Sequence, residues 1–593
     1  MSTSLRITLG QHSEPGADGG VNQDFHGALL PEGRLRTTKG VAVALADGIG
    51  SSAVSQVASA AAVRGFLDDY YATSEAWSVR RAAQRVLAAT NSWLHAQTQR
   101  GDGRFDKDRG YVCTFSALVA KGRDVHLLHV GDGRICRLHA QALEPLTEDH
   151  RVQLSSQESY LGRALGASPH VEIDYRCLPA EAGAVYLLAT DGVWAHIDAA
   201  AVHAALAAHG EDFDAACAAL CAIARARGSD DDRTVQLLRI DALPDAADAG
   251  AALQQRPEGG WAMPPPLAPR SAFEGYTVVR PLHASARSHV FLAVDDTTGA
   301  QVALKTPAVE LQQDAGLLDR FLLEEWVARR IDSPHVLKCA ATPDRPRRHV
   351  FTAMEYVEGC TLSQWMTDYP RPTLDAVRAV VAQVARGLQA FHGREMLHQD
   401  LRPENVLVDR GGTVRIIDFG SVHVAGLAEA APLRRGDAED GRADSAHAVA
   451  GTLQYTAPEC FTGAGVDARS DLFALAVLAY QMLSGQLPYG LNAARVRTPD
   501  DARRLRYVPL RHLRPELPAW LDAVLQKALH PDPRKRQEAV SEFVHDLHAP
   551  GPQFHRLRPP PLVERDPVRF WQATTVLLGV VAIVLAGLLV RAG

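Results

Sequence analysis

Carboxylates next to apolar runs are the feature of residues 1–240 with the clearest chemical use. Asp47 and Asp191 each follow such a run and precede a glycine, Asp132 lies one residue beyond a third run, and Asp231 stands shortly before a fourth. Asp-Gly is a common turn signal, so any one of these pairs alone favours a plain turn. Taken jointly, carboxylates at adjacent strand ends, with glycines that allow close backbone approach, suit hard divalent cations bound through oxygen ligands.

A second set of polar residues stands in short ordered strings beyond residue 290. Lys305 ends the run V-A-L-K, and Glu324 lies in R-F-L-L-E-E on a predicted helix. Asp400 and Asn405 lie in H-Q-D-L-R-P-E-N, and Asp418 follows in I-I-D-F-G. The strings G-T-L-Q-Y-T-A-P-E, S-D-L-F-A-L and D-P-R-K-R come after them. So many short motifs in one fixed order are very improbable by chance.

The elements that must position these residues follow from the pattern of apolar residues. In the first region we expect buried strands over 41–46, 115–120, 125–130, 184–189 and 234–240. We expect helices over 54–71, 78–97 and 199–226. The second region opens with strand-like runs over 290–294 and 302–305 and then becomes mostly helical, as over 472–483.

Length and composition set the outer limits. The chain has 593 residues, a net charge of −7 and 46% hydrophobic residues, which predicts several folded domains and excludes global disorder. Its mild acidity argues against a nucleic-acid binder. The eight cysteines are scattered without a C-x-x-C pair, which excludes a disulfide-stapled domain and suits a reducing cytosol. Stretches rich in Ala, Pro and Gly predict linkers over 243–272 and 548–569.

The first region resembles the metal-dependent, PPM-type Ser/Thr protein phosphatases. The resemblance covers residues 1–242 and implies an α/β/β/α sandwich with two Mn²⁺ or Mg²⁺ ions at one edge. It rests on ordered motifs, namely N-Q-D (22–24), A-D-G-I-G (46–50), H-V-G-D-G-R (129–134), L-T-E-D-H (146–150), L-G-R-A-L-G (161–166), A-T-D-G-V-W (189–194) and G-S-D-D-D-R-T (228–234).

The resemblance implies a role for each matching carboxylate. Asp47 would bridge both metal ions, the Gly48 carbonyl would bind one, and Asp191 and Asp231 would bind the other. Asp24 would act through a water held by the metals. Two cations lower the pKa of a bridging water that attacks the phosphorus in line. They also screen the charge that builds on the phosphoryl oxygens.

Three positions of this region call for comment. The family often has Arg or Lys three residues before the Asn of the first motif, where this chain has Gly19. Asp232 stands where Asn is usual, directly after the last metal-binding aspartate. His150 has two open interpretations, a general acid or a structural residue.

The second region resembles the eukaryotic-like Ser/Thr protein kinases over residues 273–547. The resemblance implies a bilobal kinase fold that binds ATP with Mg²⁺. Lys305 would hold the α- and β-phosphates and pair with Glu324, and Asp400 would accept or orient the proton of the substrate hydroxyl. Asn405 and Asp418 would ligate Mg²⁺.

Other positions also match the kinase motifs, but several of them carry a different residue from the one usual in the family. Arg402 replaces the usual Lys and would still offer a cation to the γ-phosphate, and Met354 would be among the nucleotide-binding residues. Gln399 stands where the catalytic loop usually carries Arg, so activity should depend less on phosphorylation of the activation segment. Glu459 and Arg536 resemble a buried ion pair. The three positions of the glycine-rich loop carry other residues, His283, Ser285 and Ser288.

Glycine lets backbone N–H groups close over phosphates without interference from a Cβ atom. The altered loop therefore predicts weakened or slow use of ATP. Two alternative functions are open for the second region. Either it is an active kinase, or it is a pseudokinase that binds nucleotide or a partner and regulates the phosphatase. The intact Lys305, Glu324, Asp400, Asn405 and Asp418 favour the active kinase.

The last feature is an apolar tail. Residues 570–590 carry no charge, and Arg565 and Arg569 precede them. At about 1.5 Å per residue a helix of this length spans a bilayer core. A buried C-terminal helix is the alternative. We expect a single transmembrane helix that anchors both domains on the cytoplasmic side of the inner membrane.

Together these features predict a multidomain α+β protein that combines a phosphatase sandwich, a kinase and a C-terminal transmembrane helix. The predicted function is a membrane-tethered bifunctional enzyme of reversible protein phosphorylation. Its expected partners are protein and phosphoprotein substrates, including its own kinase domain, and not nucleic acid.

Overall fold

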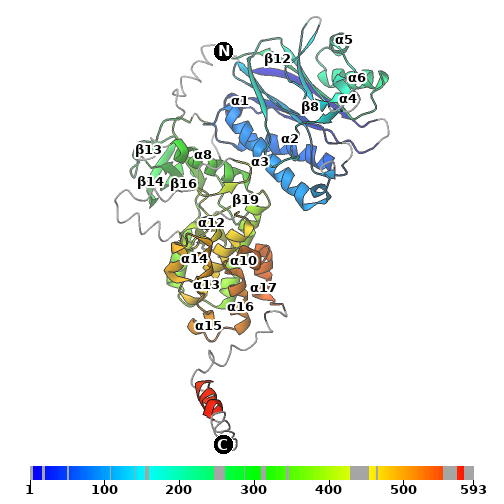
Figure 1. Ribbon diagram of the computed structural model, residues 1–593. Coiled ribbons are helices and arrows are strands. Elements are labelled where there is room, and N and C mark those ends of the chain that lie inside the picture. Colours follow the sequence, from blue (N-terminus) through cyan, green and yellow to red (C-terminus); the bar gives the residue numbers. More distant parts are fainter. Residues whose placement is uncertain are drawn as a thin grey trace, which may run out of the picture. The chain divides into compact units, whose positions relative to one another are not determined.

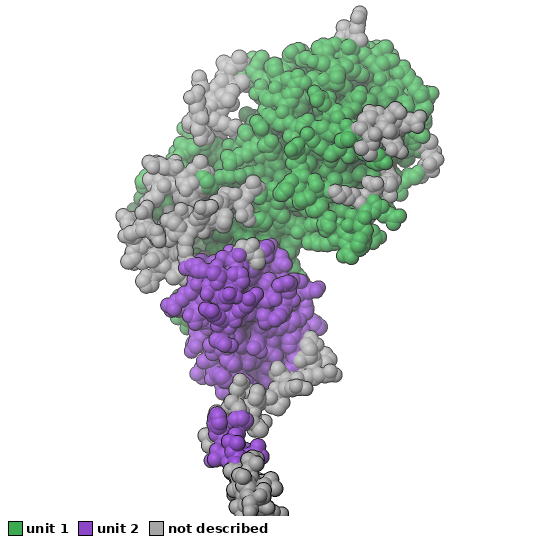
Figure 2. All heavy atoms as spheres, viewed as in Figure 1, with its two compact units in different colours: residues 1–367, 386–452 green, residues 368–385, 453–593 purple. Residues whose placement is uncertain are grey.

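The computed structural model describes residues 4–16, 20–49, 52–106, 109–139, 142–153, 159–245, 261–285, 287–308, 315–341, 345, 347–427, 453–462, 465–551, 554 and 570–579. The chain divides into two compact units (Figure 2). The first comprises residues 1–367 and 386–452, and the second comprises residues 368–385 and 453–593. Most of the predicted linker over 243–272 lies outside the described residues, at 246–260.

The N-terminal region is built on two five-stranded antiparallel sheets (Figure 1). One sheet has the order β1-β12-β11-β6-β7, with β1 Arg6–Glu14, β12 Arg233–Ala242, β11 Val185–Ala189, β6 Arg134–Leu138 and β7 Leu143–Pro145. The other has the order β10-β5-β4-β3-β2, with β10 Asp174–Pro179, β5 Asp124–Val130, β4 Phe115–Lys121, β3 Val41–Ala46 and β2 Phe25–Leu29. The short hairpin β8 Arg151–Gln153 and β9 Ser159–Leu161 stands beside them.

Helices cover the outer faces of both sheets. Helix α2 (Ser55–Ala72) contacts β2, β3 and β4, whereas α6 (Phe213–Ala226) contacts β1 and β12 of the other sheet. Every residue of β3 is buried, because one face of the strand meets α2 and the other meets the core between the sheets. The predicted α/β/β/α sandwich is confirmed. The remaining helices of the region are α1 Gly33–Lys39, α3 Val79–Arg100, α4 Asp191–Trp194 and α5 Ala199–His209, with a 3-10 turn at Asp102–Arg104.

One helix prediction was too long. The segment predicted as a single helix over 199–226 forms α5 and α6. Gly210 ends α5 with a φ of 60°, a left-handed conformation that glycine adopts without strain. Asp212 then caps α6 by accepting a hydrogen bond from the Ala215 N–H.

The C-terminal region begins in the first unit with a third five-stranded antiparallel sheet. Its order is β13-β14-β15-β16-β17, with β13 Ala272–Phe273, β14 Tyr276–Ala284, β15 Ser288–Asp295, β16 Gln301–Pro307 and β17 Thr352–Glu355. Helix α8 (Ala315–Arg330) lies between β16 and β17 in the chain. Smaller sheets follow, one of β18 Gly359–Thr361, β20 Val406–Asp409 and β21 Val414–Ile416, and one of β19 Met396–Leu397 and β22 His423–Val424. Helices α9 Leu362–Asp368 and α10 Leu374–His392 lie between β18 and β19 in the chain, and residues 374–385 of α10 belong to the second unit.

The second unit is helical, as predicted from its apolar pattern. Helix α13 (Ala468–Ser484) is buried along almost its whole length. The predicted ion pair between Glu459 and Arg536 is present, at 2.7 Å with both side chains buried. The other helices here are α12 Glu459–Thr462, α14 Pro499–Arg503, α15 Leu510–Leu513, α16 Ala519–Ala528 and α17 Val540–His548, with 3-10 turns at Gly490–Arg495 and Pro533–Lys535.

The predicted membrane anchor is contradicted. Within the described residues no helix is both long and apolar enough to cross a membrane. This finding overturns the transmembrane helix predicted over 570–590 and the inner-membrane anchor that depended on it. Residues 580–590 lie outside the described part of the chain.

Candidate active sites

The predicted metal-binding residues of the first region share one cleft. Asp47 directly follows β3, Asp191 begins α4 directly after β11, and Asp231 precedes β12. These three aspartates and Gly48 line a cleft of about 720 Å³, together with Asp132. The sandwich brings residues far apart in sequence together because both sheets end at this edge.

Asp24 lies buried beside that cleft. Its Oδ2 accepts a hydrogen bond of 2.9 Å from the Thr190 hydroxyl. Thr190 in turn accepts a hydrogen bond of 3.1 Å from the Thr234 N–H of β12. Asp24 is thereby tied to both β11 and β12, the strands next to Asp191 and Asp231.

The aspartates of this cleft lie close enough together for their negative charges to repel one another. Burial, and then the nearby charges of Asp24 and Asp191, hold the pKa of Asp47 well above its usual range. Burial likewise raises the pKa of Asp24 to about 7 and that of Asp191 to about 6. A cation bound here would relieve this repulsion.

The donor chemistry of the cleft fits a hard divalent cation. All of these side chains offer oxygen, the ligand that Mg²⁺ prefers, and Asp24 Oδ1 is buried without a hydrogen-bond partner among the described residues. The positions of these side chains, however, do not form a complete metal site. Across the described chain no group of three or more His, Cys, Asp or Glu side chains is placed so that it could hold a metal ion.

Arg151 contributes to this lack of a complete metal site, because it pairs with two of the carboxylates. Its guanidinium lies 2.6 Å from Asp132 Oδ2 and 2.8 Å from Asp191 Oδ2. The side chain therefore supplies positive charge to two of the carboxylates in the cleft. Nothing in the sequence motifs singled out this arginine, which comes from the short hairpin strand β8.

His150 takes the structural interpretation. Its Nδ1 accepts a hydrogen bond of 3.0 Å from the Gly131 N–H, and its Nε2 lies 3.0 Å from Asp174 Oδ2. Both ring nitrogens are thus engaged with the protein. His150 thus joins β10 to the turn after β5, which favours the structural interpretation.

The second predicted site centres on Lys305 of β16. Its Nζ lies 2.5 Å from Glu324 Oε1 on α8 and 3.1 Å from Asp418 Oδ1. Its two carboxylate neighbours outweigh burial, so the pKa of Lys305 lies above its usual value. The lysine is therefore charged, and its ammonium group is positioned by the two carboxylates, where it can contact an anionic ligand. The structure brings together three residues that lie 113 positions apart in the chain at their extremes.

Asp400 and Asn405 form the next part of this site. The Asn405 side-chain amide donates to the Asp400 carbonyl at 2.8 Å and to Asp400 Oδ2 at 3.1 Å. Burial raises the pKa of Asp400, which makes its carboxylate a stronger base than an exposed one. Arg402 Nε lies 3.9 Å from Asp400 Oδ2, and Met354 is buried on β17 beside Ala303.

The comparisons with known proteins agree with this geometry. Residues 16–237 match the family model described as protein phosphatase 2C, and residues 276–547 match the one described as protein kinase domain. The chain contains a phosphatase 2C domain and a protein kinase domain. The resemblances stated from the sequence are confirmed at this level.

Individual relatives cover one domain each. The kinase domain is 33% identical over 281 residues to the serine/threonine-protein kinase Pkn1 of Myxococcus xanthus, which corresponds to 45% of this chain and 37% of Pkn1. This chain thus spans about a third of that relative's length. The crystal structure of the Mycobacterium tuberculosis PknI kinase domain is 31% identical, with a TM-score of 0.36, and covers 48% of this chain and 98% of that one. The phosphatase domain matches the catalytic domain of the phosphatase PstP, solved with two manganese ions, at 23% identity and a TM-score of 0.33, over 40% of this chain and all of that one.

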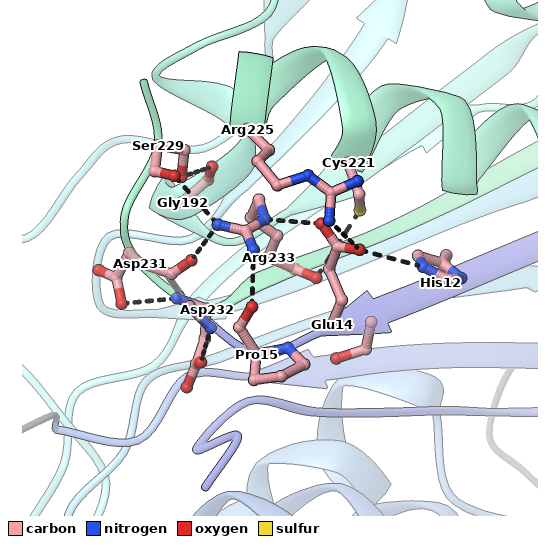
Figure 3. Close-up of polar contacts among 12 residues, drawn as sticks. His12, Glu14, Pro15, Gly192, Cys221, Arg225, Ser229, Asp231, Asp232 and Arg233 are labelled. Atoms are coloured by element: carbon pink, nitrogen blue, oxygen red, sulfur yellow. Dashed lines mark hydrogen bonds and ion pairs between the residues drawn. The ribbon is translucent and has the colours of Figure 1, made fainter. Parts of the chain in front are cut away.

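Arg233 is a residue of the phosphatase domain that sequence analysis missed. Its side chain is 2% exposed and donates to four acceptors, Glu14 Oε1, Pro15 O, Ser229 O and Asp231 O (Figure 3). The two last carbonyls belong to the loop that holds Asp231. Arg233 therefore fixes that loop against the end of β1. It falls within the motif G-S-D-D-D-R-T, as the first residue of β12, but the motif does not indicate which groups its side chain binds.

Asp232 has a related part in the same loop. Its carboxylate accepts hydrogen bonds of 2.7 Å from the Gly16 N–H and the Gln23 N–H (Figure 3 shows Asp232 beside Arg233). An Asn side chain, which is usual here in the family, has one acceptor oxygen where Asp has two. The aspartate thus joins the Asp231 loop to the segment that leads into Asp24.

Replacing Arg233 with Met should lower the affinity of the phosphatase domain for Mn²⁺ by about 10- to 100-fold, as expected when a group that orients a metal ligand is removed. The change removes the guanidinium but keeps most of the length. Titration calorimetry with Mn²⁺ measures the effect. The matched control is Arg225→Met, because Arg225 reaches the same Glu14 at 3.6 Å from an exposed position and lies on helix α6 rather than in the Asp231 loop. Equal affinity in both variants would contradict the positioning role.

The glycine-rich loop of the kinase domain is closed by one serine. The Ser285 hydroxyl accepts hydrogen bonds from the N–H groups of Arg287, at 3.3 Å, and Ser288, at 3.1 Å. The Ser285 N–H itself donates to Ser288 O at 2.9 Å. These are backbone donors that a glycine-rich loop would direct at phosphates. The structure thus gives a second reason, besides restricted φ, for weak phosphate contacts here.

Other predicted features of both domains fall outside the described residues. They are Gly19 of the phosphatase domain and most of the polar segment of the kinase domain between Gly420 and Gly451, from residue 428 onward. The reduced dependence on phosphorylation of that segment, expected from Gln399, stays a prediction.

Proposed function

We propose that this chain is a bifunctional enzyme of reversible protein phosphorylation. Its phosphatase domain removes phosphate from phosphoserine and phosphothreonine, and its kinase domain transfers phosphate from ATP to Ser or Thr. The observation that carries the proposal is that each domain holds its reacting groups together. Asp47 shares its cleft with Asp191 and Asp231, and Lys305 contacts both Glu324 and Asp418.

In the phosphatase domain, the carboxylates of Asp47, Asp191 and Asp231 and the Gly48 carbonyl would hold Mn²⁺ or Mg²⁺. Such ions supply Lewis acidity to the phosphate and a nucleophile from water at neutral pH. Asp24 lies buried beside them and accepts a hydrogen bond of 2.9 Å from the Thr190 hydroxyl. It would act through a water held by the metals.

In the kinase domain, Lys305 would contact the α- and β-phosphates of ATP while Glu324 orients its ammonium group. Asp418 and Asn405 would hold Mg²⁺, which neutralises charge on the phosphates. Asp400 would accept or orient the proton of the substrate hydroxyl, and its raised pKa supports that use. Arg402 stands 3.9 Å from Asp400 and would bring a positive charge close to the transferred phosphate.

The pseudokinase alternative is favoured by one observation, the engagement of loop N–H groups by Ser285. It predicts nucleotide binding without phosphate transfer. The two functions are separated by incubating the full chain with γ-labelled ATP and a mixed-sequence Ser/Thr protein acceptor, over a range of Mg²⁺ and Mn²⁺ concentrations. Transfer that disappears in the Asp400→Asn variant supports the kinase, and binding of labelled ATP without transfer supports the alternative.

Removal of divalent metal should abolish phosphate release from a phosphothreonine peptide by the full chain. The physical reason is that the carboxylates around Asp47 repel one another and offer no Lewis acid of their own. Assays with and without EDTA, followed by addition of Mn²⁺ or Mg²⁺ in excess, measure the effect. Phosphate release that persists after complete chelation would contradict the metal-dependent mechanism.

A further inference from the structure

Helix α8 of the kinase domain contacts helices α2 and α3 of the phosphatase domain within the first compact unit. In the first turns of α8, the Asp319 carboxylate pairs with two arginines of α3, Arg81 at 2.7 Å and Arg85. These arginines are four residues apart, so they stand one above the other on the same face of α3. Asp319 is mostly buried between them, with 13% of its side chain exposed.

The other end of α8 is held by a second ion pair. Arg330, the last residue of the helix, lies 2.7 Å from Asp69 of α2, and the two side chains are 6% and 9% exposed. Asp319 and Arg330 are eleven positions apart, or about 16 Å along a helix. A buried charge is costly without its partner. The two pairs therefore hold α8 against the phosphatase domain along most of its length.

Aromatic packing fills the space between these pairs. Trp326 of α8 meets Trp77, which precedes α3, edge to face with ring centroids 6.2 Å apart. Both rings are buried, and the Arg85 guanidinium lies over the Trp77 ring at 4.3 Å. Edge-to-face pairs of this kind add to the burial of apolar surface. The contact thus has an apolar centre and charged ends, as stable interfaces do.

Helix α3 also meets the chain that follows Asp418. At Gly426, an added Cβ atom would lie 2.5 Å from Ala88 O and 2.3 Å from Ser92 Oγ of α3. Gly426 has a φ of 82°, so glycine fits here both for its backbone and for its lack of a side chain. The phosphatase domain thus contacts both α8, which carries Glu324, and the chain eight residues beyond Asp418.

The contact bears on catalysis because α8 carries Glu324. Glu324 lies two residues before Trp326, and its carboxylate is 2.5 Å from Lys305 Nζ. A helix that shifted or rotated would separate these two groups, since the ion pair tolerates little displacement. We propose that the phosphatase domain is an intramolecular activator of the kinase domain, which clamps α8 in the position where Glu324 meets Lys305. This inference rests on the proposed kinase function.

The clamp has a reciprocal consequence. If docking on α8 favours the nucleotide-binding arrangement of Lys305, then nucleotide binding must favour docking by the same factor. Occupation of the kinase site would thereby tighten the contact with α2 and α3. The two activities of the chain would be linked through one surface, made of Asp69, Trp77, Arg81 and Arg85 on the phosphatase side.

The test is charge reversal at Asp319 in the full chain. Asp319→Arg should speed amide hydrogen exchange in peptides from residues 315–330 and lower the rate of phosphate transfer by roughly tenfold, within the usual range of coupling between sites. Hydrolysis of p-nitrophenyl phosphate by the phosphatase domain should stay at the wild-type rate. The triple variant Asp319→Arg, Arg81→Asp, Arg85→Asp restores the pairing with signs exchanged and should recover both exchange protection and transfer.

A control in the same surface region is Asp68→Arg, because Asp68 is exposed on α2 beside the buried Asp69. It should change neither exchange nor transfer. Wild-type exchange in Asp319→Arg, or faster exchange with an unchanged transfer rate, would overturn the proposal. If the wild-type chain transfers no phosphate, the proposed kinase function fails. Hydrogen exchange and the affinity for a fluorescent ADP analogue then still decide whether α8 is clamped.

Discussion

Replacing Asp47 with Asn is expected to lower phosphatase turnover by more than about 100-fold, since even groups that only orient a metal ligand cost up to that much. Asp47 lines the acidic cleft, and its carboxylate is acted on by the charges of Asp24, Asp191, Asp132 and Asp231. The amide is nearly isosteric but offers one neutral oxygen where the carboxylate offers two charged ones. The measurement is the release of phosphate from a phosphothreonine peptide with Mn²⁺ in excess.

Loss of activity in this variant should not come from unfolding. Burial and like charges already disfavour the ionised form of Asp47, as its raised pKa shows. The neutral amide removes that repulsion, so the metal-free variant should be at least as stable as the wild type in thermal melts. Asp68→Asn, at an exposed position of α2, is the control and should keep full turnover. A stable Asp47→Asn variant with wild-type turnover would refute the assignment of the cleft.

Replacing Asp400 with Asn should lower transfer of phosphate from ATP by about 10²- to 10⁴-fold, the usual contribution of a positioned general base. Asp400 is held by the Asn405 side chain at 3.1 Å, and burial raises its pKa. The amide keeps the shape of the residue but cannot accept the proton of the substrate hydroxyl. Initial rates with γ-labelled ATP and a protein acceptor, at saturating Mg²⁺, measure the change.

This variant should retain the rest of the kinase site. Affinity for a fluorescent ADP analogue should stay near the wild-type value, because Lys305 and Asp418 are untouched. Glu404→Gln, four residues further along and exposed, is the matched control and should transfer phosphate at the wild-type rate. Equal transfer by wild type and Asp400→Asn would show that another group accepts the proton.

Much of both sites could be predicted from the sequence because the functional residues stand at ends of regular elements. The run at 41–46 is apolar throughout, which predicts a strand buried on both faces, and the residue after its end is necessarily Asp47. The same reasoning placed Asp191 after β11 and Asp231 before β12. In the kinase domain, Lys305 within β16 and Glu324 on α8 follow from ordered strings whose spacing is tied to one fold.

The sequence could not reveal contacts that depend on tertiary packing. Arg233 binds a loop, a strand end and Glu14, which is 219 positions away. Arg151 reaches Asp191 from a hairpin strand only three residues long. The surface between α8 and helices α2 and α3 joins residues more than 230 positions apart. Neither the periodicity of apolar residues nor the spacing of motifs predicts which residues make these contacts.

Two sequence predictions were wrong for identifiable reasons. The helix expected over 199–226 was drawn from alanine-rich composition, but Gly210 and the cap at Asp212 divide it. The transmembrane helix was drawn from length and hydropathy over 570–590, whereas the described helical stretch covers 570–579. In the first case composition predicted helical structure but not the break within it, and in the second it did not yield a membrane-spanning helix within the described residues.

The claim that one chain both adds and removes phosphate is tested most directly by comparing label accumulation in four full-length proteins. Wild type, Asp47→Asn, Asp400→Asn and the double variant are incubated with γ-labelled ATP, Mg²⁺ and Mn²⁺, and protein-bound label is followed over time. We predict the highest plateau for Asp47→Asn, a lower one for wild type, and initial labelling slowed by about 10²- to 10⁴-fold in the two proteins that carry Asp400→Asn. Equal plateaus for wild type and Asp47→Asn, or unchanged initial labelling in Asp400→Asn, would contradict the proposed bifunctional enzyme.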